Sequence, residues 1–392
     1  MKVVIITHTP FPEGLAPTNR VFYHAKGLQD NHVEVKVIIA LPTEKFNNVK
    51  NPVAVGVYKG IEFEYSLRKT ERSKHFLRRR FDDFIGPVKA GIKAIREKPD
   101  AVLMISYSSI YVLCVLKLIF LISGKTFIVE ETEFPLFGKK DNGVFRLRNK
   151  FLKKFLYKNL DGFLVISHEL KKRYSKLVSK KCPVVLIPVI VDVSDIYDAS
   201  VERTRNLVYT GPLVQKKDGI LTILKSFSSI AEKFPEVKLV CTGNVNISPD
   251  KERVLSEIQN CEYKDRIVMT GFISREKMIE YLNSACGLVL AKPSSEQADT
   301  CFPTKLGEYL STGNPIVVTK TGEIPLYLQD GTDAYIAEPD SVESFTQKLM
   351  ELLSNPEKAA AIGLKGRETA MKHFNYKEIS KKVINLIGDL QN

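Results

Sequence analysis

A short segment in the last third of the chain combines carboxylates, a lysine and hydroxyl groups around a predicted helix start. Residues 290–319 have the sequence LAKPSSEQADTCFPTKLGEYLSTGNPIVVT. The pattern predicts a strand, a polar loop, a short helix over about 304–312 that ends at Gly313, and a second strand. Backbone N–H groups at such a helix start bind anions such as a diphosphate. Glu308 lies one turn inside, where its carboxylate can accept hydrogen bonds from vicinal hydroxyls such as those of a ribose.

A second group of candidate residues is basic. Lys216 and Lys217 follow Gly211 in a predicted loop that could reach a diphosphate. Breaking a bond between a sugar and a phosphate leaves negative charge on the leaving group, and fixed cations stabilise that charge in the transition state. Lys305 adds a third cation and no Asp-x-Asp motif is present, so we expect a metal-independent reaction. The alternative for Lys216 and Lys217 is an exposed lysine-rich turn.

These residues need a sheet to position them, and both halves of the chain predict one. In the second half, NLVYTG, VKLVCTG, RIVMTG, GLVLAK and PIVVTK each precede a helical segment. The glycines that end the first three, Gly211, Gly243 and Gly271, are expected at the ligand-binding edge of a parallel sheet. In the first half, candidate strands lie at 3–7, 33–40, 101–106, 127–131 and 163–167, separated by segments long enough for helices.

The predicted fold class is therefore α/β, with two doubly wound domains. The boundary is placed at the segment IPVIVD, residues 187–192, which gives an N-terminal domain over 1–190 and a C-terminal domain over 191–375. An amphipathic helix over about 376–392 could pack back on either domain.

The segment around Glu308 resembles the large family of retaining glycosyltransferases with GT-B architecture, whose signature is a Glu, seven residues and a second Glu. Glu308 matches the second Glu, and GEYLSTGNPIVV matches the helix, turn and strand that follow it. HTPFPEGLAPTNR, FLVISHELKKRY with IPVIVD, and LVYTGPLVQKKDGILTIL resemble other parts of the same family. The resemblance implies two Rossmann-like domains that face each other across a cleft.

The implied activity is transfer of a hexosyl or N-acetylhexosaminyl unit, with retention, from a UDP- or GDP-linked sugar to a hydroxyl of a lipid-linked or polysaccharide acceptor. Such a reaction serves cell-surface glycan biosynthesis and uses no cofactor besides the donor. In the family, Glu308 would hold the ribose and a lysine at 216 or 217 would stabilise the leaving nucleotide. The donor-binding residues implied are Gly14, Gly211, Gly243, Gly271, Phe272, Glu296, Asp299, Thr300, Phe302, Thr304, Lys305 and Glu308.

Thr300 stands where the family has its first Glu, so this chain departs from the signature. FPTKLGEYL resembles a subgroup in which a Pro-Ser/Thr-Lys segment precedes the helix. Glu296 or Asp299 could replace the missing carboxylate at the donor sugar. The departure also leaves two alternatives open: a noncatalytic nucleotide-sugar-binding assembly subunit, and a GT-B sugar-nucleotide epimerase.

On the acceptor side, FIVEETEFP places three carboxylates at the end of a predicted strand. The family has polar residues of the N-terminal domain over the donor sugar, sometimes a His. Glu130 or Glu133 could take that place as the group that orients the acceptor, with a purely structural role as the alternative. His8, His24 and His168 are interpreted as structural or solvent-facing.

Charge is distributed unevenly along the chain. Residues 1–200 contain 34 Lys and Arg against 20 Asp and Glu, a net charge of +14, whereas residues 201–392 contain 24 against 25, a net charge of −1. The asymmetry indicates an anionic partner for the first domain, such as a membrane surface or a phosphorylated lipid. The basic segments 68–81 and 145–158 include Phe, Leu and Tyr, as interfacial helices do, with a solvated face as the alternative. No nucleic-acid-binding module is recognised.

The chain has no sequence pattern of a membrane span or a signal peptide. Residues 101–122 carry one charge, Lys117, but serines interrupt the segment, which therefore predicts a strand, a loop and a buried helix. Residues 1–8 form a strand-like segment that lacks the features of a signal peptide. The six cysteines show no close pairing. We expect a cytoplasmic protein, attached peripherally to the inner face of the cell membrane.

Overall fold

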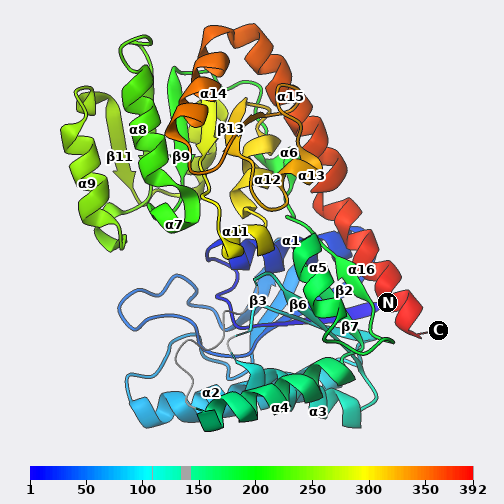
Figure 1. Ribbon diagram of the computed structural model, residues 1–392. Helices are drawn as coiled ribbons and strands as arrows, with labels where there is room; N and C mark the ends of the chain where they lie inside the picture. Colours follow the sequence, from blue (N-terminus) through cyan, green and yellow to red (C-terminus); the bar gives the residue numbers. More distant parts are fainter. Residues whose placement is uncertain (108, 134–142, 392) are drawn as a thin grey trace. The chain divides into compact units, whose positions relative to one another are not determined.

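The computed structural model describes residues 1–107, 109–133 and 143–391, with side chains in the last range from residue 150 onward. Contacts between Cα atoms divide the chain into unit 1, Met1–Ile190 with Tyr376–Asn392, and unit 2, Val191–Asn375. Each unit is a predominantly parallel sheet covered by helices (Figure 1), so the predicted α/β fold class is confirmed.

In unit 1 the sheet has the strand order β3-β4-β2-β1-β5-β6-β7-β8, and only β3 and β4 pair antiparallel among the described strands. The strands are β1 (Lys2–Thr7), β2 (Glu34–Ile39), β3 (Val55–Tyr58), β4 (Ile61–Tyr65), β5 (Ala101–Ile105), β6 (Thr126–Glu131), β7 (Gly162–Val165) and β8 (Val184–Leu186). The helices are α1 (Ala16–Asp30), α2 (Phe76–Arg96), α3 (Ile110–Ile122), α4 (Gly143–Asn159), α5 (His168–Ser175) and α16 (Tyr376–Gln391).

In unit 2 the sheet is parallel throughout, with the order β11-β10-β9-β12-β13-β14. The strands are β9 (Asn206–Thr210), β10 (Lys238–Thr242), β11 (Ile267–Gly271), β12 (Gly287–Leu290), β13 (Ile316–Thr319) and β14 (Tyr335–Ala337). The helices are α6 (Val193–Ile196), α7 (Gln215–Asp218), α8 (Ile220–Ile230), α9 (Lys251–Asn260), α10 (Arg275–Ser284), α11 (Glu296–Thr300), α12 (Thr304–Ser311), α13 (Ile324–Tyr327), α14 (Val342–Ser354) and α15 (Pro356–His373).

Among its parallel strands, each sheet changes direction of strand order once. The change falls between β1 and β5 in unit 1 and between β9 and β12 in unit 2. Loops that leave the carboxyl ends of such a strand pair diverge to opposite faces of the sheet, which opens a crevice for ligands. The topology thus favours a ligand-binding site at the carboxyl ends of β9 and β12 in unit 2.

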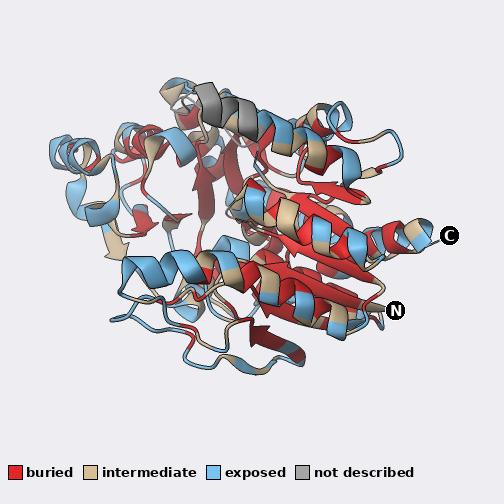
Figure 2. Ribbon diagram, turned by 90° about the horizontal axis from the view of Figure 1, so that it is seen from below, coloured by how far each residue is buried: buried red, intermediate tan, exposed pale blue. Residues whose placement is uncertain are grey.

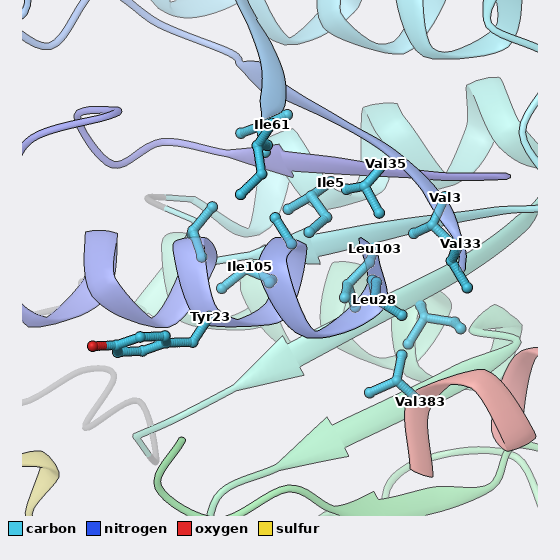
Figure 3. Packing of buried hydrophobic residues seen from close by; sticks show 14 of the residues in the cluster. Val3, Ile5, Tyr23, Leu28, Val33, Val35, Ile61, Leu103, Ile105 and Val383 are labelled. Atoms are coloured by element: carbon cyan, nitrogen blue, oxygen red, sulfur yellow. The ribbon is translucent and has the colours of Figure 1, made fainter. Parts of the chain in front are cut away.

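The C-terminal helix α16 packs on unit 1. Side chains of α16, including Val383, join the core that β1 and β5 form with Leu28 of α1 (Figure 3). The two helices approach closely, since a Cβ atom on Gly27 would lie 2.7 Å from the carbonyl oxygen of Tyr376. The Tyr376 hydroxyl also donates a hydrogen bond to Asp30, at 2.5 Å. The last helix of the chain therefore completes the core of the first unit.

The apolar segment 101–122 forms β5 and α3, as predicted. Its single charge, Lys117, is buried and donates to Asp161 Oδ2 at 2.8 Å. Of the helices that the structure describes, none combines the length and the apolar character needed to cross a membrane.

A buried ion pair connects three parts of unit 1. Arg20 of α1 donates from Nε and Nη2 to the two carboxylate oxygens of Glu130 in β6, at 2.9 and 2.7 Å. The same guanidinium donates to the carbonyl oxygens of Ile187 and Pro188, at 2.9 and 2.8 Å. His24 lies 2.9 Å from Glu130 Oε1. Burial alone raises the pKa of Glu130, but Arg20 and His24 outweigh burial and lower it to about 2.

This geometry corrects the expectation that Glu130 orients an acceptor. Its side chain is fully buried, and both carboxylate oxygens are already hydrogen-bonded inside unit 1. Glu130 holds α1 and the segment before Ile190 against the sheet.

Replacing Glu130 with Ala should lower the free energy of unfolding by about 3–5 kcal/mol, because the Arg20 charge would stay buried without its carboxylate. Chemical denaturation measures this difference. Glu133→Ala, which removes an exposed carboxylate three residues away, is the control and should change stability by less than about 0.5 kcal/mol. Equal stability of the two variants would contradict the role of the pair. Since the folded pKa is depressed, the stabilisation by Glu130 is present above the ordinary carboxyl pKa of 4.5 and is lost as the pH falls toward 2.

Candidate functional site

Three glycines lie side by side at the carboxyl edge of the unit 2 sheet, as predicted. The Gly211 N–H donates to the carbonyl oxygen of Thr242 at 3.2 Å, and the Gly243 N–H donates to that of Gly271 at 2.9 Å. All three have positive φ, of 125°, 124° and 72° in chain order. A Cβ atom on Gly243 would lie 2.2 Å from the Gly211 carbonyl oxygen, so the backbones meet at a distance that only glycine permits.

Lys305 reaches this edge from the first turn of α12. Its Nζ lies 2.5 Å from Asp218 Oδ2 and 4.7 Å from the centre of the Tyr209 ring. The Tyr209 hydroxyl donates to the same carboxylate oxygen at 2.9 Å. Burial lowers the pKa of Lys305, and Asp218 opposes this effect. A Cβ atom on Gly211 would lie 2.4 Å from Nζ, so the missing side chain at 211 makes room for the lysine.

Asp218 and Tyr209 were not predicted as site residues. Together with Lys305 they connect α7, β9 and α12 at the end of β9. Gly219 extends the connection to β12, because its φ is 68° and a Cβ atom there would lie 1.8 Å from the carbonyl oxygen of Ala291. The Asp218 carboxylate fixes the position of the Lys305 ammonium group and partly neutralises its charge.

Lys216 and Lys217 lie in the short helix α7, where a loop was expected. Both are exposed, and within the described part of the chain neither ammonium lies within 4.0 Å of a carboxylate. The backbone of α7 is held by Asp250, whose Oδ2 accepts from the Gln215 N–H at 2.8 Å. The two lysines therefore project free charge from a fixed backbone beside Gly211.

Glu308 lies one turn into α12, next to a cation that sequence reasoning missed. Its Oε1 is 3.1 Å from Nη1 of Arg275, the first residue of α10. Helix α12 is itself anchored to β9, because the Tyr309 hydroxyl accepts from the Thr210 N–H at 2.8 Å. At its start, Thr304 is exposed and the N-cap residue Pro303 gives no side-chain hydrogen bond to the first turn. The helix start and Glu308 thus belong to the same sheet edge as the glycines.

The polar loop before α12 contains a further short helix, α11, which was not predicted. Glu296 and Asp299 are exposed on it, whereas Thr300 is buried and its hydroxyl donates back to the carbonyl oxygen of Glu296 at 3.0 Å. Phe272 is exposed directly after β11. Phe302 corrects an expectation: its ring is buried and packs edge-on against Tyr327 and Phe374, at 5.3 Å each, so it supports the loop from inside.

The remaining candidates lie in unit 1. Gly14 is exposed before α1, and a Cβ atom there would lie 2.0 Å from the hydroxyl oxygen of Thr18. Glu133 is exposed beyond β6, beside residues outside the described range. Glu131, between the two predicted glutamates, accepts a hydrogen bond from the Tyr107 hydroxyl, and burial raises its pKa to about 7. Successive side chains of a strand point to opposite faces of the sheet, so the sequence alone could have shown that Glu130 and Glu131 lie in different surroundings.

Among the described residues, no cluster of three or more His, Cys, Asp or Glu side chains is arranged to hold a metal ion.

Residues 198–369, which lie within unit 2, match the family model described as Glycosyl transferases group 1. The match covers less than half of the chain and includes every candidate residue of unit 2 named above. It supports the family expected from the sequence for this part of the chain.

Two curated relatives are similar over comparable lengths. N-acetyl-alpha-D-glucosaminyl L-malate synthase from Bacillus anthracis is 22% identical over 176 residues, which is 45% of this chain and 43% of the relative. GDP-mannose-dependent alpha-(1-6)-phosphatidylinositol monomannoside mannosyltransferase from Mycolicibacterium smegmatis is 22% identical over 170 residues, which is 42% of this chain and 43% of the relative. The chain thus matches less than half the length of either protein.

Solved structures match nearly the whole chain. Sucrose-phosphate synthase from Thermosynechococcus elongatus superposes with a TM-score of 0.72 at 15% identity, covering 99% of this chain and 98% of that one. HepE from Anabaena, in complex with UDP and glucose, gives a TM-score of 0.72 at 12% identity and covers 99% of both chains. At this identity the likeness concerns the fold, and it confirms the expected GT-B architecture.

Gly243→Ala should destabilise the protein by roughly 1–3 kcal/mol, because the new Cβ would collide with backbone at a φ that alanine rarely adopts. Thermal unfolding gives the comparison with Gly331→Ala, whose φ of 71° lies near the left-handed region that alanine adopts at a modest cost and whose Cβ would meet no atom within 4 Å. The Gly243 variant should be clearly the less stable of the two. If both lose the same amount, neither the close approach nor the larger φ of Gly243 adds to the ordinary cost of alanine at positive φ.

Proposed function

We propose that this chain is a glycosyltransferase of the group 1 family, which moves a sugar from a nucleoside diphosphate sugar to an acceptor hydroxyl with retention of anomeric configuration. The observation that carries the proposal is the arrangement of Lys305 and Glu308 on α12, at the end of β9 beside the three glycines. This is the edge at which a parallel sheet of this strand order binds ligands, and it lies in the segment that matches the family model.

Each part of the edge has a proposed role. The glycine backbones permit close approach of the nucleotide, and the start of α12 faces the diphosphate. The Glu308 carboxylate accepts hydrogen bonds from the ribose hydroxyls, with Arg275 holding it in place. Lys216 and Lys217 meet the charge that develops on the leaving nucleoside diphosphate, as fixed cations do in transition states of this kind. No metal is assigned to the reaction.

The donor sugar is proposed to contact α11. Glu296 or Asp299, both exposed there, would replace the carboxylate that the family has at position 300, because Thr300 is buried and hydrogen-bonded within the helix. The nucleotide is proposed to be UDP or GDP. One relative is named as dependent on GDP-mannose, and the HepE structure contains UDP and glucose, so both bases belong in the test.

Unit 1 is proposed as the acceptor-side domain. Gly14 and Glu133 are its proposed contributions to the donor sugar and the acceptor. The acceptor is proposed to be a lipid-linked or polysaccharide glycan of the cell surface. The protein would act in the cytoplasm with peripheral attachment to the membrane, because unit 1 carries the positive excess of the chain.

The direct test incubates the protein with a panel of UDP- and GDP-linked hexoses and N-acetylhexosamines, with and without hydroxyl acceptors. Nucleotide release that depends on an acceptor, with a product of unchanged anomeric configuration by NMR, supports the proposal. Isomerised donor without transfer would instead identify an epimerase. Tight donor binding without any turnover would identify a noncatalytic binding subunit.

Glu308→Ala should weaken donor binding by about 1–3 kcal/mol, because a charged hydrogen-bond acceptor for the ribose is lost. Isothermal titration calorimetry with the donor measures the change. Glu276→Ala, which removes an exposed carboxylate next to Arg275, is the control. A folded Glu308 variant with wild-type donor affinity would remove this residue from the ribose site.

The double substitution Lys216→Ala and Lys217→Ala should lower kcat more than it weakens donor binding, because the charge that the lysines meet grows in the transition state. Steady-state kinetics and donor titration separate the two effects. Lys225→Ala with Lys233→Ala removes the same charge from exposed positions near α8 and should leave kcat unchanged. Unchanged kcat in the first variant, or an equal loss in both, would exclude the proposed role.

A further inference from the structure

Helix α2 turns most of its large apolar side chains away from the protein. Amphipathic helices normally place such side chains against the core. In α2 the buried residues are mostly small, namely Gly86, Pro87, Ala90, Gly91 and Ala94. The exposed residues include Phe76, Leu77, Phe81, Phe84 and Ile92, with Leu77 80% exposed and Phe84 66% exposed.

The inward face of α2 cannot accept these large side chains. A Cβ atom on Gly86 would lie 2.2 Å from the carbonyl oxygen of Ala40, and one on Gly91 would lie 3.1 Å from Cδ1 of Ile119. The small residues let the helix lie directly on its neighbours. The orientation of α2 is therefore set by close packing, and the outward position of Leu77 and Phe84 is a fixed property of the fold.

Helix α3 continues the same surface. It is apolar all round except for Lys117, and that lysine points inward to Asp161. Leu118, Leu121 and Ile122 face outward, with Ile122 79% exposed. An apolar helix of this kind is normally buried on every side. Helix α3 packs between α2 and α4, and the outward Phe151 of α4 is also exposed.

The three helices lie on one side of the unit 1 sheet, and α1 and α16 lie on the other (Figure 1). Figure 2 views the protein from the side of α2, α3 and α4, and the outer turns of helices are pale blue there while the strands behind them are buried. Large apolar side chains exposed together on one layer of helices mark an interaction site. We call this surface, with Phe76, Leu77, Phe81, Phe84, Leu118, Leu121 and Ile122, the α2–α3 face.

The charges around the α2–α3 face are positive. Arg78, Arg79 and Arg80 are exposed within one turn of Phe76, Leu77 and Phe81, and Lys89 and Lys154 are exposed farther along the helices. The carboxylates of α2 offset this charge only in part, because Asp82 is buried and is shared between Lys69, at 2.6 Å, and Nε of Arg78, at 3.8 Å. Asp83 lies 3.7 Å from Arg80. Cations interleaved with aromatic and aliphatic side chains complement a bilayer with anionic headgroups above an apolar interior.

We propose that the α2–α3 face is the surface by which this protein docks on an anionic lipid bilayer, with Arg78, Arg79 and Arg80 at the headgroups and the neighbouring apolar side chains in the interface. The inference deepens the membrane attachment in the proposed function and assigns it to particular residues. It does not need the donor site, which lies in the other unit. Long side chains such as arginine keep their charge at the headgroups while their carbon chains lie along apolar surface.

Cosedimentation with vesicles of phosphatidylglycerol and phosphatidylcholine, against vesicles of phosphatidylcholine alone, tests the proposal. The wild-type protein should bind the anionic vesicles and lose part of this binding as salt rises, since charges are screened within about 8 Å at physiological ionic strength. Combined replacement of Arg78, Arg79 and Arg80 by Gln should weaken binding by roughly tenfold or more. Phe81→Ser with Phe84→Ser should weaken the part of the binding that remains at high salt.

The matched control replaces Lys377, Lys381 and Lys382 of α16 by Gln, which removes the same charge from exposed positions on the opposite side of the sheet. This variant should bind vesicles as the wild type does. An equal loss in the control would show attraction by net charge alone and would overturn the docking face. Failure of the wild type to bind anionic vesicles at low salt would overturn it as well.

A protein partner is the competing occupant of the face. If light scattering shows a dimer that Phe81→Ser with Phe84→Ser dissociates, while vesicles bind neither form, the face is an interface between two copies and the proposal is wrong. Donor titration is run on every variant and should give wild-type affinity throughout. If the wild-type protein binds vesicles but does not bind the donor, the proposed function is wrong and the docking proposal still holds.

Discussion

The candidate site depends on how closely backbone segments approach at the edge of the unit 2 sheet. Gly211 leaves the space that Lys305 occupies, and Gly243 lies against the Gly211 carbonyl oxygen. Lys305 in turn holds Asp218, which closes α7 onto β9. Because these groups are closely packed, α7, α12 and the ends of β9 and β10 form one rigid edge. Such rigidity is what a site needs if its N–H groups and cations are to act without reorganisation.

Much of this edge could be predicted from the sequence because short local sequence patterns determine it. Strands that end in Thr-Gly are recognisable, and so are the helix start at Thr304 and its end at Gly313. The β3–β4 hairpin was missed because Val55 and Val57 are exposed and the turn uses Lys59 with Gly60, both at positive φ. Lysine at such a position gives no turn signal. Three-residue β14 is too short to show a period.

Partners across the fold could not be predicted, since they depend on which helices come together. In the sequence, nothing distinguishes Asp218 from any other residue at a helix end, because its partner Lys305 comes from α12. Arg275 likewise lies 33 positions from Glu308, the carboxylate that it contacts. The same limit explains Glu130. Its place at a strand end is visible in the sequence, but only the packing of α1 shows that Arg20 occupies both of its oxygens.

The docking of α16 on unit 1 has a consequence for how the chain is made. Unit 1 is discontinuous in sequence, because its core includes Val383 and Ile387, which follow the whole of unit 2. During synthesis the ribosome releases residues 191–375 before the last part of the unit 1 core exists. Unit 2 can therefore fold as an uninterrupted segment, whereas the core between α1 and the sheet of unit 1 stays incomplete until α16 is made. Its final stability is acquired only once the terminal helix has left the exit tunnel.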